Sequence, residues 1–259
     1  MSNTIVLFGA KPDWEPFIRA ELDADRYECM FADLRTTDID AFDLIVPLTL
    51  DDYLALEDQA EVAKGRALFP PRDVVKLCHD KLRFNQFVLA SDLAWTIPPL
   101  LEKTSPPPFI LKQRQDEFGA NTHLVMTPDG SERLRAQLDD PNYFAQTYVA
   151  GDLEFATHIL VQDGQATFHL NVAYEMGDKY YVKNKSFTQK DVSVNRDDKE
   201  LDLFVSVLAL IGFENGTCCF NYKYAGDRIQ IFELNPRFGG SLKHGINEYL
   251  RAYEVAVAA

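Results

Sequence analysis

Short apolar runs alternate with segments of helical periodicity over the first third of the chain. Three runs of about five residues are rich in apolar side chains, which is typical of strands in a buried sheet. Between them, apolar residues recur every three or four positions, which predicts helices. The strands are expected at Thr4–Phe8, Tyr27–Phe31 and Leu44–Leu48, and the helices at Trp14–Leu22 and Asp51–Lys64. This alternation predicts a small parallel α/β layer.

The sequence Phe69-Pro70-Pro71 marks the expected end of this layer, since adjacent prolines interrupt helices and central strands. We therefore expect an N-terminal α/β domain over residues 1–72 and a second domain over residues 73–259. The second domain is expected to begin with a helix over about Asp73–Ala90 and to become mostly β-strand from Tyr143 onward. Its predicted elements are strands at Phe109–Lys112, Phe144–Val149, Glu154–Val161 and Ala166–Ala173, a helix at Leu201–Ile211, and a hairpin of Thr217–Tyr224 with Arg228–Leu234.

Composition narrows the classes of partner. The chain of 259 residues has 26 basic and 40 acidic side chains, a formal net charge of −14. Because nucleic acids and anionic membranes bind basic surfaces, neither is expected as a partner. The longest apolar stretch, Leu203–Phe213, is far shorter than the roughly 20 residues of a membrane span. The four cysteines show no zinc-ligand spacing, and no secretory signal opens the chain, so a cytoplasmic protein is expected.

The glycine fingerprint of dinucleotide-binding folds is absent, since Gly9 stands alone after the first strand. The richest chemistry lies instead in residues 232–241. Glu233, Asn235 and Arg237 would project from one face of a strand, because side chains alternate between faces. Carboxylate and amide oxygens suit Mg²⁺, and a guanidinium balances phosphate charge. Asn221, on the expected neighbouring strand, is a candidate further metal ligand.

Two lysines and one irregular strand end are candidates for contacts to phosphate and to a purine. Lys81 follows Asp80, and Lys112 closes an apolar strand, where an ammonium usually meets an anion. Main-chain groups at a strand end can pair with a purine, and a following carboxylate, here Glu154, can accept from ribose hydroxyls. The residues expected at the purine are Gln146, Thr147, Tyr148 and Val149.

In the order of these motifs the sequence resembles the ATP-grasp superfamily of carboxylate–amine ligases, and more loosely the ATP-binding halves of carbamoyl phosphate synthetase, over roughly residues 71–251. The matching segments are Asp80-Lys81 and Phe109–Lys112 for two phosphate lysines, Gln146–Gly151 for an adenine hinge, Glu154 for a ribose carboxylate and Glu233–Arg237 for a magnesium and phosphate signature. The resemblance implies an α+β lid subdomain over about residues 105–148, a core subdomain built on an antiparallel sheet, and the cofactors ATP and Mg²⁺, with Mn²⁺ as a substitute.

The sequence departs from the family in two places. The loop at residues 113–121 has one glycine and two acidic residues, where the family has several glycines that allow closure over the phosphates. Acids beside a triphosphate repel it unless a metal ion or Arg114 intervenes, or they serve a cationic amine substrate. The position of the first metal ligand holds Asn221 or Lys223 in place of Glu, Asp or Gln. One magnesium ion is expected at Glu233 and Asn235, and both one and two ions are compatible with the sequence.

The resemblance implies a ligase that activates a small carboxylate as an acyl phosphate and joins it to an amine. Arg237 would stabilise the transferring phosphoryl group, and the loop of Gly239, Gly240 and Ser241 would meet the substrate carboxylate. His158 and His244 are weaker candidates for substrate contact. The alternatives are a phosphotransferase on the same scaffold and an ATP-binding regulatory module without turnover. A homodimer is one assembly compatible with the sequence.

Overall fold

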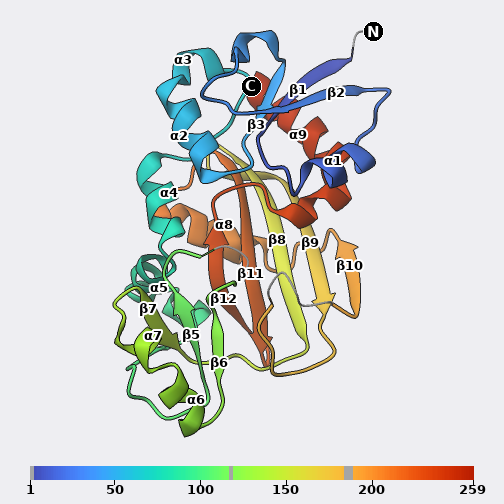
Figure 1. The fold of residues 1–259 in the computed structure, drawn as a ribbon. Coiled ribbons are helices and arrows are strands. Elements are labelled where there is room, and N and C mark those ends of the chain that lie inside the picture. Colours follow the sequence, from blue (N-terminus) through green and yellow to red (C-terminus); the bar gives the residue numbers. More distant parts are fainter. Residues whose placement is uncertain (1–2, 117–118, 184–188) are drawn as a thin grey trace.

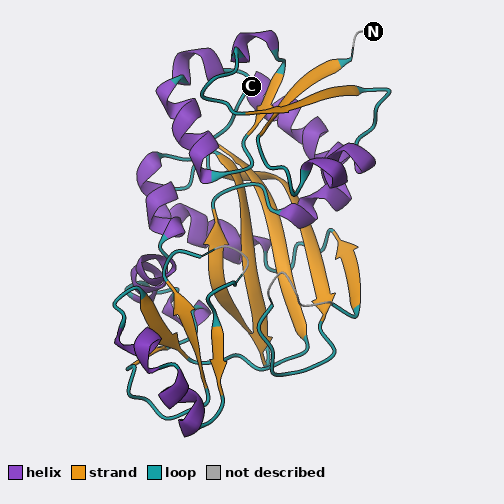
Figure 2. Cartoon of the chain, in the orientation of Figure 1, coloured by secondary structure: helices purple, strands orange, loops and turns teal. Residues whose placement is uncertain are grey.

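The computed structural model describes residues 3–116, 119–183 and 189–259. Three sheets follow one another along the molecule, with the N-terminal sheet at one end and a small four-stranded sheet at the other (Figure 1). A five-stranded sheet lies between them. Helices flank all three sheets and leave the face of the central sheet that is turned toward the small sheet partly open (Figure 2).

The N-terminal sheet has the order β2-β1-β3, and both pairings are parallel, as the alternation of strands and helices predicted. Both faces are covered. Val6 and Phe8 pack toward the C-terminal helix, whereas Leu7 packs with Leu56 and Ala63 from the helices after β3. The elements are β1 (Thr4–Gly9), α1 (Glu15–Glu21), β2 (Tyr27–Ala32), the 3-10 turn η1 (Ile39–Ala41), β3 (Leu44–Val46), α2 (Leu50–Asp58) and α3 (Ala60–Ala63). The single helix predicted over Asp51–Lys64 is therefore two helices.

Gly9 has a structural explanation. The carboxylate of Asp52 accepts hydrogen bonds from the main chain of Leu48 and Thr49, and Thr49 and Asp52 form a capping box at the start of α2. A Cβ on Gly9 would lie 2.0 Å from Asp52 Oδ2. Glycine is thus required by the close approach of β1 to the capped helix.

The central sheet is antiparallel, in the order β10-β9-β8-β11-β12. Its strands are β8 (Leu153–Gln162), β9 (Gln165–Glu175), β10 (Asp191–Asn195), β11 (Gly216–Ala225) and β12 (Arg228–Asn235). Asp163 and Gly164 join β8 to β9 with φ angles of 48° and 75°, the backbone of a tight hairpin turn that glycine favours. Helix α8 (Leu201–Ile211) covers one face, where Phe204 stacks on Phe220 with ring centroids 4.5 Å apart.

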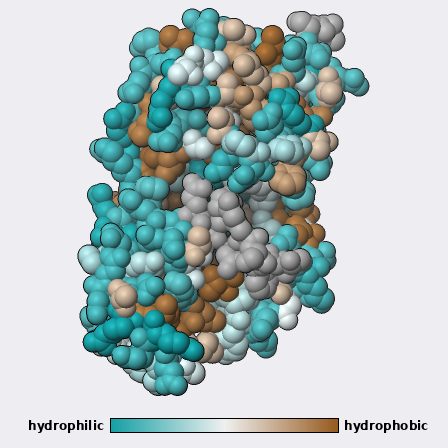
Figure 3. Space-filling view, in the orientation of Figure 1, coloured by the Kyte–Doolittle hydropathy of each residue, from teal (hydrophilic) through white to brown (hydrophobic). Residues whose placement is uncertain are grey.

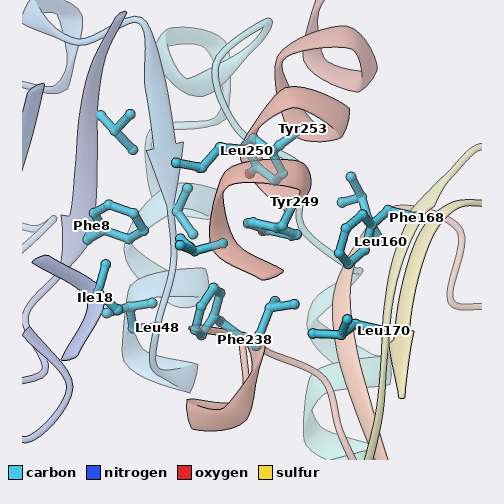
Figure 4. Packing of buried hydrophobic residues seen from close by; sticks show 14 of the residues in the cluster. Phe8, Ile18, Leu48, Leu160, Phe168, Leu170, Phe238, Tyr249, Leu250 and Tyr253 are labelled. Carbon is cyan, nitrogen blue, oxygen red and sulfur yellow. The ribbon is translucent and has the colours of Figure 1, made fainter. Parts of the chain in front are cut away.

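The C-terminal helix α9 (Ile246–Ala258) joins the N-terminal sheet to the central sheet. The 3-10 segment η3 (Gly240–Gly245) leads into it. Tyr249 packs edge-on against both Phe168 and Phe238, and Phe8 lies on the opposite side of the same cluster (Figure 4). Because the side chains of both sheets interdigitate in this cluster, the N-terminal layer is held against the loop after β12.

The small sheet has the order β4-β7-β5-β6, and its pairings are antiparallel. It encloses a separate core that includes Phe109, Leu111 and Leu138. Its elements are β4 (Leu100–Leu101), β5 (Phe109–Gln113), β6 (His123–Val125), α6 (Pro128–Arg133), α7 (Arg135–Asp139) and β7 (Tyr143–Gln146).

One predicted helix is divided in two, and one predicted strand is shorter than expected. The helix predicted over Asp73–Ala90 is α4 (Arg72–His79) and α5 (Lys81–Leu89), because Asp80 adopts an extended ψ of 95° and its side chain accepts from Arg83 N as the N-cap of α5. The 3-10 turn η2 (Ala94–Thr96) follows. The strand predicted over Phe144–Val149 ends at Gln146, after which Thr147 N donates one further hydrogen bond to Pro99 O.

The surface seen in Figure 3 is mostly hydrophilic, in keeping with the charged composition. Among the described residues, no helix has the length and apolar character that crossing a membrane would require.

Candidate functional site

A cavity of about 350 Å³ lies between the small sheet and the open face of the central sheet. Strands β5 and β7 line one side, β8, β11 and β12 line the other, and Trp14 closes the end near the N-terminal layer. Of the two weaker candidates, His158 lines this cavity and His244 does not. The main candidates all line it: Lys81, Lys112, Gln146, Thr147, Tyr148, Val149, Glu154, Asn221, Glu233, Asn235, Arg237, Gly239, Gly240 and Ser241. Segments 160 residues apart in the sequence thus meet here.

Glu233 is the centre of the candidate metal site. Asn221 stands opposite it in the β11–β12 register, and the amides of Asn221 and Asn235 lie 3.2 and 3.0 Å from Glu233 Oε1. Lys81 Nζ is 3.4 Å from Glu233 Oε2. Burial by itself would raise the pKa of Glu233, but Lys81, Asn235, Lys112 and Arg237 outweigh burial and lower that pKa. The carboxylate is therefore charged at neutral pH.

This donor set fits a magnesium ion held jointly with phosphates. One carboxylate and two amides supply oxygen donors, and each amide presents its oxygen after a half-turn. Among the residues that the structure describes, no cluster of three or more His, Cys, Asp or Glu side chains could hold a metal ion. Because Mg²⁺ commonly binds through one or two carboxylates plus phosphate oxygens, Glu233, Asn221 and Asn235 would hold it only weakly without a nucleotide.

A β-bulge shapes this wall of the cavity. Asn221 pairs with Glu233, whereas Tyr222 pairs with Ile231, so Phe232 is the extra residue on β12. The bulge lets consecutive side chains, Phe232 and Glu233, both line the cavity. Regular alternation along a strand would place Phe232 and Glu233 on opposite faces. The sequence analysis therefore did not predict that Phe232 lines the cavity. Asn235 and Arg237 line the cavity with Glu233, as predicted.

Lys112 lies on the opposite wall. Its Nζ donates to Gln146 Oε1 at 2.8 Å, and Gln146 Nε2 donates to Pro98 O at 2.8 Å. Gln146 is fully buried, so its side chain orients Lys112 instead of facing a ligand. Burial lowers the pKa of Lys112 to about 8. A lysine so deeply buried, with one hydrogen-bond acceptor in the described part of the chain, is suited to meet an anion in the cavity.

Beyond Gln146, the chain forms an irregular hinge that ends at Gly151. Lys223, buried on β11, donates to Gly151 O at 2.9 Å and lies 3.9 Å from the centre of the Tyr181 ring. Burial lowers the pKa of Lys223 to about 8. Lys223 therefore supports the hinge through its hydrogen bond to Gly151 O. Of the two candidates for the first metal ligand, Asn221 and Lys223, Asn221 is the one that contacts Glu233, as predicted.

Among the described residues, Glu154 has two partners from the segment after β9. Lys183 Nζ is 3.1 Å from Glu154 Oε1, and the Tyr181 hydroxyl donates to Glu154 Oε2 at 3.3 Å. Lys183 also lies 3.7 Å from the centre of the Tyr174 ring. Sequence reasoning missed Lys183, because it is 29 residues from Glu154 in a stretch without a recognisable motif.

The end of the cavity near Ser241 contains His158, which the sequence analysis named as a weaker candidate for substrate contact. His158 is fully buried, and its Nε2 lies 2.8 Å from Ser241 Oγ. Its Nδ1 has no hydrogen-bond partner among the described residues. Burial, with the nearby charges of Lys183, His244 and Arg237, lowers the pKa of His158 to about 3, so the ring is neutral. The alternation of β8 from Glu154 through Ala156 to His158 was the available signal.

The acidic loop after β5 is held by contacts to α5 and to its own main chain. The Arg114 guanidinium pairs with Asp80, with Nη2 2.5 Å from Oδ2, and no ion pair joins it to Asp116 among the described residues. Lys81 Nζ donates to the main-chain oxygen of Asp116 at 2.5 Å, and Asp116 Oδ2 accepts from Asn121 N. Residues 117–118 of the predicted loop lie outside the described residues.

Comparison with known proteins finds similarity in structure alone. No family model and no curated protein matches the chain in sequence. Among solved structures, D-alanine–D-alanine ligase from Bacillus anthracis in complex with ATP superposes with a TM-score of 0.64 at 13% identity, covering 99% of this chain and 97% of that one. L-amino acid ligase from Bacillus licheniformis gives 0.66 at 16% identity, covering 99% and 75%. N5-carboxyaminoimidazole synthetase from Staphylococcus aureus in complex with ADP gives 0.68 at 13% identity, covering 100% and 78%.

These neighbours are ATP-grasp enzymes, and the coverage extends over nearly the whole chain. The chain therefore has the ATP-grasp fold, and the fold prediction is confirmed. A parallel three-stranded sheet precedes the antiparallel sheets that enclose the cavity, as the resemblance implied.

Proposed function

We propose that the protein is an ATP-dependent ligase that activates a small carboxylate, such as an amino acid, and joins it to an amine. The observation that carries the proposal is the convergence of Glu233 and its two amides with Lys81, Lys112 and Arg237 in one cavity. Oxygen donors and cations in this combination suit a metal-bound triphosphate. Magnesium as the metal and the cytoplasm as the compartment are part of the proposal.

In this proposal ATP lies between the two sheets. The hinge residues Tyr148 and Val149 would contact adenine, and Glu154 would accept hydrogen bonds from the ribose hydroxyls. Lys112 and Lys81 would contact the phosphates, whose terminal group would lie toward Arg237. A magnesium ion bound by Glu233, Asn235 and Asn221 would offset the negative charge of the phosphate chain.

Two transfers complete the reaction. An oxygen of the substrate carboxylate attacks the γ-phosphorus and ADP leaves, which forms an acyl phosphate. The amine then attacks the acyl carbon, phosphate departs and the nitrogen loses a proton. Gly239, Gly240 and Ser241 would hold the substrate carboxylate, and Arg237 would balance the charge of the transferring phosphoryl group. No protein nucleophile is needed, and burial raises the pKa of Cys219 to about 12, which keeps this nearby thiol protonated.

One observation favours a second candidate. Because position 221 holds an amide, Glu233 is the one carboxylate among the three proposed metal ligands Glu233, Asn221 and Asn235. Metal binding is therefore weaker than with two carboxylates. This favours an ATP-binding regulatory module without turnover. The phosphotransferase hypothesis differs only in the acceptor, a hydroxyl that keeps the phosphate.

The test is ADP release from Mg·ATP against a panel of amino acids and small carboxylates, with and without an added amine. A ligase requires the carboxylate and yields free phosphate with a new amide detectable by mass. A phosphorylated acceptor indicates the phosphotransferase, and ATP binding without turnover indicates the module.

Arg237→Ala is the decisive variant. Loss of one charge-stabilising contact in a closed site often costs about 3–4 kcal/mol, so turnover should fall well over tenfold. Arg228→Ala is the matched control, because Arg228 is exposed at the start of β12, far along the strand from the end that leads to Arg237. Near-normal turnover of Arg237→Ala would refute the assigned role.

A further inference from the structure

Two ring side chains pack closely against the loop after β12 that contains Gly239, Gly240 and Ser241. A Cβ on Gly239 would lie 2.5 Å from His158 Cε1, and a Cβ on Gly240 would lie 3.3 Å from Trp14 Cε2. Ser241 is held by a direct contact, since His158 Nε2 lies 2.8 Å from its Oγ. Three consecutive residues of the loop are therefore fixed by side chains from β8 and from the N-terminal layer.

The neutral ring of His158 allows two arrangements of the protons at this contact. A neutral imidazole has one N–H donor and one bare acceptor nitrogen. If Nε2 carries the proton, His158 donates to Ser241 Oγ, and the serine hydroxyl keeps its own proton for a ligand. If Nδ1 carries it, Nε2 accepts the proton of Ser241, and the serine has no donor left. The tautomer of His158 therefore decides what Ser241 offers to the cavity.

The surroundings of Nδ1 select between the two tautomers. His158 is fully buried, and Nδ1 has no hydrogen-bond partner in the part of the chain that the structure describes. Buried N–H groups without an acceptor are rarer in proteins than acceptors without a donor. A Cβ on Gly239 would lie 3.1 Å from Nδ1, so a Cα hydrogen of the glycine points toward this edge of the ring. That hydrogen suits a bare nitrogen and would crowd an N–H, which favours the proton on Nε2.

We propose that His158 is a positioning residue that directs the Ser241 hydroxyl toward the carboxylate of the substrate. The inference rests on the proposed ligase function and on the role given there to Ser241. His158 donates through Nε2 to one lone pair of Oγ, which leaves the Ser241 proton to a carboxylate oxygen. Ser241 is half-buried and lines the cavity, so its hydroxyl is accessible to a ligand there.

Removal of the ring nitrogens should therefore weaken the binding of the carboxylate and leave the binding of the nucleotide unchanged. A hydrogen bond to a charged group is stronger than one between neutral groups, so KM for the carboxylate should rise about tenfold in His158→Leu. The value of kcat should change much less, since the lost contact holds the substrate before and during the reaction. His158→Gln keeps an amide donor and should restore most of the lost affinity.

The first measurement is nuclear magnetic resonance of the full-length protein, isotopically labelled at the histidine ring nitrogens, at neutral pH. The signals of His158 are assigned by their loss in His158→Gln. Nitrogen chemical shifts distinguish a ring N–H from a bare ring nitrogen, and we expect the proton on Nε2. A proton on Nδ1 would overturn the proposal. Because no substrate is added, this result does not depend on the proposed function.

The second measurement is steady-state ADP release from Mg·ATP with the amino acid or small carboxylate that gives the highest rate. The variants are His158→Leu, His158→Gln, Ser241→Ala and the double variant His158→Leu/Ser241→Ala, each checked for folding by thermal melting. KM in the double variant should equal that of Ser241→Ala, because His158 acts through this hydroxyl. His169→Leu is the matched control, since His169 is on the neighbouring strand β9, outside the cavity, with its Nε2 3.1 Å from Arg196 O.

An unchanged KM in His158→Leu overturns the proposal. So does an additive loss in the double variant, or an equal loss in His158→Gln and His158→Leu, because either result indicates that the ring only supports the packing of the loop. Absence of carboxylate-dependent ADP release in the unaltered protein refutes the proposed function itself, and this is seen before any variant is made.

Discussion

Raising the pH from 7 to 9 should weaken the binding of Mg·ATP, because Lys112 loses its proton in the free protein. Burial lowers the pKa of this lysine from 10.5 to about 8. Phosphate oxygens beside the ammonium would restore the higher pKa in the complex, since an adjacent negative charge favours the charged form. Binding above pH 8 therefore requires the uptake of a proton.

The magnitude follows from the shift. At pH 9 about nine-tenths of free Lys112 is neutral, so reprotonation costs about 1.4 kcal/mol and the affinity falls about tenfold relative to pH 7. The limit, reached near pH 10.5, is about 3 kcal/mol. The stability of the free protein changes in the opposite direction: the folded state binds fewer protons than the unfolded state between pH 8 and 10.5, so this group adds stability as the pH rises.

Isothermal titration at pH 8 in two buffers of different ionisation enthalpy measures the proton uptake, which should be about half a proton from Lys112. Lys112→Arg keeps its charge and should flatten the pH dependence. Lys223 has a similar pKa at the hinge, so Lys223→Met removes its separate contribution. An affinity constant within twofold from pH 7 to 9, or an unchanged slope in Lys112→Arg, would contradict the reasoning.

Three further predictions concern the ends of the cavity. His158 has a folded pKa of about 3 against 6.5 when unfolded, so its contribution to stability is lost as the pH falls between these values. Between pH 7 and pH 4.5, the unfolding free energy of the unaltered protein should fall by about 2–3 kcal/mol more than that of His158→Gln. Equal dependence of the melting temperature on pH in the two proteins would contradict this prediction. In Gly239→Ala the new Cβ would lie 2.5 Å from His158 Cε1, so denaturant unfolding should show a loss of about 1–3 kcal/mol, whereas Gly130→Ala, with its nearest neighbour at 3.5 Å, should show none. Glu233→Gln should weaken Mn²⁺ binding in the presence of ADP about tenfold or more by electron paramagnetic resonance, with adenosine binding retained; equal Mn²⁺ affinity would exclude Glu233 as a ligand.

Local patterns in the sequence were sufficient to predict most elements and the gathering of the candidate residues. The alternation of strands and helices predicted the parallel N-terminal sheet, and the predicted hairpin placed Asn221 on the strand next to that of Glu233, as observed. These features depend on interactions between residues close together in the chain or on strand periodicity, which a sequence displays directly. The ordered motifs carried the fold prediction.

Tertiary structure decided the features that depend on distant partners. Asp80 breaks the predicted helix, where it caps α5 and pairs with Arg114, 34 residues away. The bulge at Phe232 turns two consecutive side chains into the cavity. Strand β7 ends at Gln146, beside Pro98 and Pro99 of the partner segment, which have no N–H to continue the ladder.

The same division holds for the chemistry of the site. The sequence by itself determined which residue types were available to a metal-bound triphosphate and the order in which they occur. Only the folded chain brought Lys183 to Glu154, directed Gln146 to Lys112 and buried His158 against Ser241. Burial and charge depend on every neighbour in space, so the charge states of these side chains are properties of the assembled cavity and of no single segment.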